Sequence, residues 1–253
     1  MPIPPALPRR SAADVQTRSA TTRLFTAYVW GLLLLTLPPL WVALSVLPEG
    51  RLPNRLLKCC ARLVIRLSTC RLRVRGLEHL ERCGPAMFVA NHASYLDSVV
   101  LMAAIPVDYR FVVNHRALTW PLIGLAIRKV GHLVVDRTRL VGRHACALAM
   151  RETLRQGMSV MVFPEGTIHR NGEPLAFRPG AFRIAVEVGR PVVPISLRGT
   201  RHVLPDGPWL FRRGCLDVTI HEPIEPVATG RQEIVRLRDC ARREIFTARE
   251  PRP

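Results

Sequence analysis

The chain has 253 residues, which is enough for one sizeable α/β domain with an appendage. Its formal net charge of +18 comes almost entirely from arginine, and such a charge predicts an anionic partner: nucleic acid, an anionic membrane surface or phosphate-bearing substrates. The basic residues are spread along the chain, aromatic residues make up only 6%, and no nucleic-acid-binding motif is present, which argues against nucleic acid. The seven cysteines are odd in number and lack C-x-x-C spacing, which argues against a disulfide framework or a zinc site.

The N-terminal part of the chain differs in composition from the rest. Residues 1–22 are rich in Pro, Ala, Ser and Arg without periodicity, which is typical of a disordered basic arm. Residues 23–70 are predicted to form a membrane-anchoring helical segment. Its second half, residues 51–70, has apolar residues at helical spacing with Arg and Lys between them. That amphipathic helix can lie on anionic lipid headgroups or pack on the domain, and the two interpretations are compatible.

Residues 24–47 contain no charged side chain, and the run is longer than the roughly 20 residues that span a bilayer. Pro38 and Pro39 are expected to break a helix near the middle of this run. Trp30 and Trp41 belong to residue types that prefer the membrane interface. The run therefore predicts either a bilayer span or a helix in one leaflet, and a buried core helix is the remaining interpretation.

Short apolar runs alternate with helical patterns over residues 71–253, which predicts an α/β domain. Strands are expected at residues 71–76, 86–90, 109–113, 133–135, 158–162, 192–197 and 216–220. Helices are expected from residue 98 to the proline at 106 and at residues 120–130, 140–155, 178–188 and 232–249. The predicted fold class is therefore α/β, with a mixed central sheet flanked by helices and preceded by an N-terminal membrane-associated helical segment.

A polar stretch, Asn91–Asp97, separates a buried-strand pattern from the helix that follows it. α/β folds place reactive groups beyond the carboxyl ends of their strands, and His92 lies at such a turn. Residues five apart do not share a helix face, so His92 and Asp97 can meet only if His92 precedes the helix and Asp97 lies in its first turn. The pair would then act as a general base and the carboxylate that orients it. The alternative is that Asn91 caps the helix and His92 is a polar turn residue.

A second stretch, Phe163–Thr167, follows another buried-strand pattern and reads F-P-E-G-T. Together with the N-H-x4-D pattern of Asn91–Asp97, it resembles the glycerolipid acyltransferase family, whose best-known members are 1-acyl-glycerol-3-phosphate acyltransferases. Further family blocks are matched in the expected order by Gly131–Arg137 (G-x5-R), Phe177–Gly180 (F-[KR]-x-G) and Val192–Ile195. The resemblance implies a glycerol-phosphate acyltransferase-like fold for this part of the chain.

The resemblance implies an O-acyltransferase that moves a fatty acyl chain from a thioester to the sn-2 hydroxyl of 1-acyl-glycerol-3-phosphate and so makes phosphatidic acid. His92 is the candidate general base and Asp97 its orienter. Ser94 is expected to bond locally rather than to act as a nucleophile. By resemblance, two arginines bind the acceptor phosphate and the F-P-E-G-T turn shapes the acceptor site; the residues are Arg137, Glu165, Gly166, Thr167 and Arg178. Backbone N–H groups near Gly166 and Thr167 are candidate donors to the oxyanion.

The expected partners are an anionic phospholipid membrane, a lysolipid acceptor, and acyl-CoA or acyl-carrier protein as co-substrate, with no cofactor, metal or nucleic acid. The expected location is the cytoplasmic face of the inner membrane, with anchoring through residues 24–47. Two alternatives stay open at this point. The acceptor could be another lysolipid, such as a lyso-ornithine lipid or a lysophospholipid, or the chain could be a non-catalytic protein that binds anionic lipid or nucleic acid.

Overall fold

The computed structural model describes residues 12–168, 175–205, 207 and 209–247. One sheet holds seven strands in the order β1-β7-β6-β2-β5-β3-β4. All neighbouring pairs are parallel except β6 and β7, so the sheet is mixed, as predicted. The strands are β1 (Arg71–Arg75), β2 (Met87–Ala90), β3 (Tyr109–Asn114), β4 (Leu133–Val135), β5 (Ser159–Val162), β6 (Val192–Arg198) and β7 (Cys215–Ile220).

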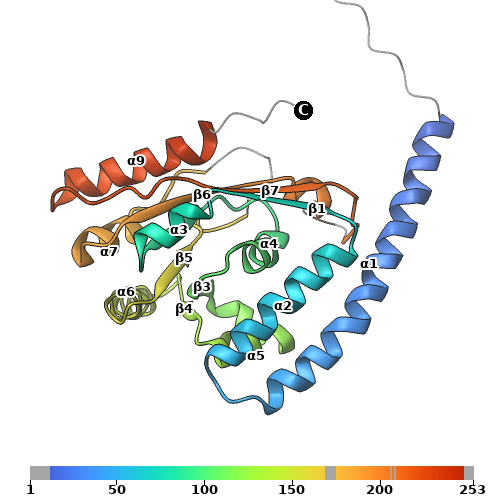
Figure 1. Ribbon diagram of the computed structural model, residues 1–253, viewed down its shortest axis with the longest axis horizontal. Coiled ribbons are helices and arrows are strands. Elements are labelled where there is room, and N and C mark those ends of the chain that lie inside the picture. Colours follow the sequence, from blue (N-terminus) through green and yellow to red (C-terminus); the bar gives the residue numbers. More distant parts are fainter. Residues whose placement is uncertain (1–11, 169–174, 206, 208, 248–253) are drawn as a thin grey trace, which may run out of the picture.

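Helices cover both faces of this sheet (Figure 1). The longer helices are α1 (Ala12–Val46), α2 (Arg51–Leu67), α4 (Leu96–Ala104), α5 (Pro121–Val130), α6 (Leu140–Arg155), α7 (Gly180–Val188) and α9 (Arg231–Thr247). Side chains of α1, α2 and α4 share one core with the sheet, and side chains of α6, α7 and α9 share the other. Strand β2 serves both cores, because Phe88 and Ala90 point to the first and Met87 and Val89 to the second.

The predicted strands and long helices of the α/β domain are all present within a few residues of their expected ends. Pro121 starts α5 at its first turn, and Gly131 ends it with a left-handed φ of 78°. Three short elements were not predicted: α3 (Glu78–Cys83), η1 (His115–Thr119) and α8 (Thr200–Val203). They are too short to have a recognisable hydrophobic period.

Helix α1 differs from the sequence prediction in two ways. It begins at Ala12, so the arm expected to be disordered to residue 22 is helical over its second half, and residues 1–11 lie outside the described residues. The helix also continues through Pro38 and Pro39, so the predicted break is wrong. The missing proline N–H groups would have paired with the carbonyls four residues earlier, on Leu34 and Leu35, and both residues lie on the exposed side of the helix.

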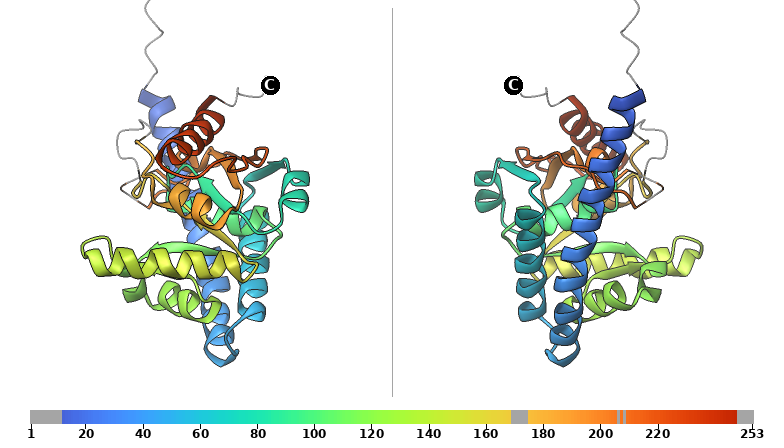
Figure 2. Two further views of the ribbon diagram at one scale, coloured as in Figure 1. Left: turned by 90° about the vertical axis from the view of Figure 1, so that its left-hand side faces the viewer. Right: turned by 90° about the vertical axis from the view of Figure 1, so that its right-hand side faces the viewer.

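The apolar part of α1, Ala20–Val46, is long and apolar enough to cross a membrane, and only 22% of its most apolar stretch is buried. Helices α1 and α2 run side by side along the α/β body (Figure 2). Phe25 and Val29 enter the main core near the middle of α1, and Leu40 and Leu44 pack with α2 and α5 near its C-terminal end. The helix is therefore fixed to the body between Phe25 and Leu44, while one side of it stays open.

Helix α2 is held on the body by a buried amine. Lys58 is 4% exposed and donates to the carbonyls of Pro106 and Val107 at 3.2 and 2.5 Å. Burial lowers the pKa of Lys58, and the nearby Asp108 carboxylate, 3.7 Å away, opposes that shift. The other side of α2 presents exposed arginines, so this helix packs on the domain and still carries an outward basic face.

Candidate active site

The predicted site residues follow three parallel strands, β2, β4 and β5, which bring them to one edge of the sheet. β5 pairs with β2 on one side and with β3 on the other, and β3 pairs with β4. His92 follows the carboxyl end of β2, Glu165 follows β5, and Arg137 follows β4. Because the carboxyl ends of parallel strands meet at one edge, residues far apart in the sequence converge there. Arg178 joins them because its backbone N–H donates to the carbonyl of Pro164 at 2.9 Å.

His92 and Asp97 form a hydrogen-bonded pair. His92 precedes α4 and Asp97 lies in its first turn, which is the geometry that the sequence required. Nδ1 of His92 lies 2.8 Å from Oδ2 of Asp97. Since that carboxylate oxygen accepts the hydrogen on Nδ1, Nε2 of the neutral ring is left to accept a proton. The side chain of His92 is 17% exposed and that of Asp97 is fully buried.

The backbone of the turn fixes the carboxylate. Oδ2 of Asp97 also accepts from the N–H groups of Ala93 and Ser94, at 2.7 and 2.8 Å. Its other oxygen, Oδ1, is buried and has no hydrogen-bond partner among the described residues. Ser94 accepts from Leu96 N–H, which is the local bond that was expected, and its hydroxyl also donates to the carbonyl of the distant Leu204.

Asn91 does not cap the helix. Its side chain pairs with the backbone of Leu197 in both directions, donating to the carbonyl at 2.9 Å and accepting from the N–H at 2.7 Å. The amide thus extends the pairing of β2 and β6 by one position and fixes where the turn leaves the sheet. The alternative interpretation of Asn91 as a cap is wrong.

The F-P-E-G-T turn supports His92 from two directions. The ring of Phe163 stacks on the imidazole, with the centroids 4.0 Å apart and the planes 13° apart. Glu165 is 2% exposed, and its Oε1 accepts from the backbone N–H of His92 at 2.8 Å. Oε2 accepts from Leu175 N–H at 3.3 Å. Sequence reasoning gave Phe163 no role, although its place directly after a strand of the same edge was a usable signal.

Burial raises the pKa of Glu165 to about 7, against the opposing effect of the two backbone donors. Between its usual value of 4.5 and about 7, the folded chain holds a proton that the unfolded chain has lost. The free energy of unfolding should therefore fall as the pH rises through this window. In Glu165→Gln, the free energy of unfolding should fall less steeply with pH than in the wild type. The measurement is urea unfolding at the lower and upper ends of this pH window. Glu222→Gln, at an exposed position, should keep the wild-type slope, and equal slopes in all three proteins would contradict the assignment.

Arg137 and Arg178 converge on Gly166. A Cβ placed on this glycine would lie 2.9 Å from Nε of Arg178 and 3.4 Å from Nη1 of Arg137. Gly166 also has a left-handed φ of 80°, so both the turn and the close approach require glycine. Burial and the neighbouring Arg178 guanidinium lower the pKa of Arg137. Within the described residues, neither guanidinium forms an ion pair with a carboxylate. Two positively charged guanidinium groups therefore lie beside Gly166, an arrangement that suits the binding of an anion.

The remaining predicted residues have clear positions. Thr167 is exposed at the end of the turn. The N–H of Gly166 donates to the carbonyl of Phe163 at 3.0 Å, so it closes the turn and is not free for an oxyanion, contrary to the expectation. His132 lies inside the G-x5-R block, Gly131–Arg137. Its ring accepts from Phe111 N–H at 3.2 Å, and burial lowers its pKa to about 3. It is therefore a neutral packing residue.

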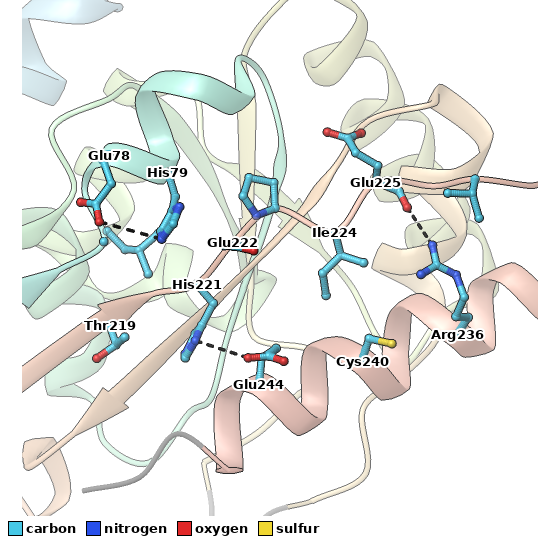
Figure 3. Close-up of a pocket in the computed structure, with 14 residues that line it drawn as sticks. Glu78, His79, Thr219, His221, Glu222, Ile224, Glu225, Arg236, Cys240 and Glu244 are labelled. Atoms are coloured by element: carbon cyan, nitrogen blue, oxygen red, sulfur yellow. Dashed lines mark hydrogen bonds and ion pairs between the residues drawn. The ribbon is translucent and has the colours of Figure 1, made fainter. Parts of the chain in front are cut away.

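A second group of polar residues lines a pocket beyond the carboxyl ends of β1 and β7 (Figure 3). Because β7 is antiparallel to β6, this is the opposite edge of the sheet from His92. Ser196 Oγ lies 2.8 Å from Nε2 of His221, whose Nδ1 lies 3.8 Å from Glu244. The Ser196 hydroxyl is 3% exposed and donates to the carbonyl of Ile245, so this group is not an activated nucleophile.

A model of the acyltransferase family matches residues 71–198, just over half of the chain and the part that holds the His92–Asp97 pair and both arginines. The chain belongs to the acyltransferase family. The match covers every element that brings the candidate active site of this acyltransferase together.

The relatives of this acyltransferase carry a common description. It is 35% identical over 153 residues to "1-acyl-sn-glycerol-3-phosphate acyltransferase BAT2, chloroplastic" of Brassica napus, a match that covers 60% of this chain and 44% of the relative. It is 31% identical over 179 residues to "1-acyl-sn-glycerol-3-phosphate acyltransferase alpha" of Ovis aries, covering 70% and 62%. The chain spans about half the length of several of the curated relatives that it matches.

A solved structure shares the fold. The 1-acyl-sn-glycerophosphate (LPA) acyltransferase PlsC from Thermotoga maritima superposes with a TM-score of 0.73 at 22% sequence identity. The match covers 93% of this acyltransferase and all of the Thermotoga chain. The predicted fold class is confirmed by this likeness.

Proposed function

We propose that this acyltransferase transfers a fatty acyl chain from a thioester donor, acyl-CoA or acyl-carrier protein, to the sn-2 hydroxyl of 1-acyl-glycerol-3-phosphate, giving phosphatidic acid. The observation that carries the proposal is the His92–Asp97 pair, at 2.8 Å, on the same sheet edge as the paired guanidinium groups of Arg137 and Arg178. The first arrangement can activate an alcohol, and the second can hold a phosphate. The names of the relatives support the same reaction.

In this reaction, Nε2 of His92 takes the proton of the acceptor hydroxyl as the hydroxyl oxygen attacks the thioester carbonyl. Asp97 stabilises the imidazolium that forms. The tetrahedral intermediate collapses, the C–S bond breaks, and the leaving thiolate takes the proton back from His92. The products are an ester and a free thiol, and no covalent enzyme intermediate or cofactor is needed.

The direct test is acyl transfer by the purified chain in liposomes, with labelled acyl-CoA and acyl-carrier protein offered against a panel of lysolipids. We expect turnover on 1-acyl-glycerol-3-phosphate. Turnover on a lyso-ornithine lipid or another lysophospholipid alone would keep the mechanism and replace the acceptor. A folded chain that acylates none of them would contradict the proposal and favour a binding role.

Arg137→Gln and Arg178→Gln are each expected to raise the KM for 1-acyl-glycerol-3-phosphate about 10- to 100-fold, because a charge-assisted contact contributes roughly 1.5–3 kcal/mol. The readout is the ratio of kcat/KM for this acceptor to that for 1-acylglycerol, which lacks the phosphate. Both variants should lose that preference. Arg139→Gln is the matched control, since its side chain, two residues from Arg137, is 82% exposed. An unchanged preference in both site variants would place the phosphate elsewhere.

We propose that the chain is membrane-associated through α1, with the helix lying in one leaflet. Thr26 near the middle of α1 bonds to Phe211, and Leu44 near its C-terminal end packs against α2 and α5, so a helix crossing the bilayer would draw the packed body in with it. The open side of α1 would enter the lipid instead. All seven cysteines are free thiols, which suits the cytoplasmic face of the membrane, where the donors are also available.

A further inference from the structure

Four aromatic side chains from separate segments touch one another beside the candidate active site, and we call them the aromatic array: Tyr95, Trp120, Trp209 and Trp30. Tyr95 stacks on Trp209 with the centroids 5.6 Å apart, and it lies 6.4 Å from Trp120. The ring of Trp209 lies 6.4 Å from that of Trp30 on α1, and Nε1 of Trp30 donates to the backbone carbonyl of Trp209 at 3.4 Å. The array therefore connects the turn before α4, the start of α5, the chain before β7, and α1.

The array is open to solvent although its members pack together. Tyr95 is 53% exposed, Trp120 and Trp209 are each 45% exposed, and Trp30 is 41% exposed. Three of the four tryptophans of the chain are thus gathered at one exposed site. Contiguous exposed aromatic surface on a folded chain marks an interaction site.

The surroundings of the array identify the kind of partner. It is continuous, through Trp30, with the open apolar side of α1, where Leu34 and Leu35 are more than two-thirds exposed. Exposed arginines lie close to its members in the sequence: Arg116 precedes Trp120 by four residues, and Arg212 and Arg213 follow Trp209 by three and four. An apolar helix face, a cluster of Trp and Tyr, and exposed arginines close to them in the sequence are the three features that an anionic bilayer surface complements.

We propose that the aromatic array docks into the interfacial layer of an anionic phospholipid bilayer and holds the His92 turn at the level of the headgroups. Tyr95 is two residues from Asp97 and three from His92, so the depth of the array sets the depth of the catalytic pair. Trp and Tyr favour this layer because their rings are apolar and their N–H and O–H groups need polar partners. The inference rests on the proposed function, since it lets a lysolipid headgroup reach His92 while its acyl chain stays in the membrane.

The first test measures depth. Single-tryptophan variants that keep Trp120, Trp209 or Trp41, with the other tryptophans changed to Phe, are mixed with anionic vesicles whose lipids carry bromine near the headgroup end of the acyl chains. Quenching of both the Trp120 and the Trp209 proteins is expected. Quenching of the Trp41 protein alone would show that only α1 enters the membrane and would overturn the proposal. Failure of the wild-type chain to float with the vesicles would overturn it as well.

The second test measures turnover. Trp120→Ala and Trp209→Ala should each lower turnover of a vesicle-embedded acceptor about tenfold, because each removes a buried aromatic surface from the docked state. Turnover of a short-chain acceptor dissolved as monomers should stay within about twofold, since no docking is needed. Leu148→Ala, on α6 and 49% exposed, is the control and should change neither rate.

The outcomes separate the two proposals. If both tryptophan variants lose turnover equally on the vesicle-embedded and the dissolved acceptor, the array acts on the site or the fold and the docking proposal fails. If the wild-type chain acylates neither acceptor, the proposed function fails, and the quenching result still decides whether the array enters a membrane. If the variants match the wild type on both acceptors, the array does not dock.

Discussion

Replacing His92 with Ala is expected to lower kcat for acyl transfer about a hundred- to ten-thousand-fold, the usual contribution of a general base. The substitution removes the imidazole, which is the group assigned to take the hydroxyl proton as the oxygen attacks. KM for the acceptor should change little, because the phosphate is assigned to Arg137 and Arg178. The measurement is kcat and KM on 1-acyl-glycerol-3-phosphate in liposomes.

The fold should survive this substitution, which makes the result interpretable. The interactions that shape the turn come from the backbone: the N–H of residue 92 still donates to Glu165, and Asp97 keeps its donors on Ala93 and Ser94. Circular dichroism and thermal unfolding verify this. His202→Ala, at an exposed position on α8, is the matched control and should keep full activity. Turnover of His92→Ala within a few-fold of the wild type would exclude His92 as the base.

The sheet was predictable from the sequence because its strands are short apolar runs that end abruptly. β2 and β5 are almost wholly buried, and each is followed directly by a polar or turn-forming motif. Both cores draw on β2, so its sequence is continuously apolar rather than alternating. The strand order was not predictable, because pairing partners such as β2 and β5 are brought together by packing over long separations.

The candidate active site, like the sheet, was predictable from the sequence only in part. The His92–Asp97 pair follows from local spacing, since one turn of backbone decides whether the two side chains meet. Arg137 and Arg178 could not be selected from composition in a chain with so many arginines, and only the family motifs picked them out. The stacking of Phe163 on His92 and the pairing of Asn91 with Leu197 depend on which strands are neighbours. The place of Phe163 directly after a strand indicates that it lies at this edge, but the local sequence does not identify its partner.

The error in α1 has a physical origin. The prediction treated Pro38 and Pro39 as helix breakers. It assumed that leaving two backbone carbonyls without an N–H partner would cost too much free energy for the helix to continue. Here the helix is fixed to the body on both sides of the prolines, by Val29 and by Leu44, so packing holds the axis together across the gap. Tertiary contacts of this kind routinely override the intrinsic helix propensity of single residues.

Asp97→Asn is expected to lower kcat about a hundred- to ten-thousand-fold while leaving the arrangement of the turn in place. The N–H groups of Ala93 and Ser94 both need an acceptor at the position of Oδ2, so the amide oxygen of Asn will occupy it. That oxygen can still accept from Nδ1 of His92, and the ring keeps its orientation. What is lost is the negative charge that stabilises the imidazolium once His92 has taken the proton.

The same substitution has a second, independent consequence. With the oxygen at Oδ2, the amide NH₂ must take the place of Oδ1, which is fully buried and has no partner among the described residues. An unsatisfied buried donor costs about 1–3 kcal/mol, so the free energy of unfolding should fall by that amount. Asp239→Asn, on the exposed surface of α9, makes the same chemical change and should alter neither property. If Asp97→Asn lost stability but kept turnover, the carboxylate would only shape the turn; loss of both places its charge in the transition state.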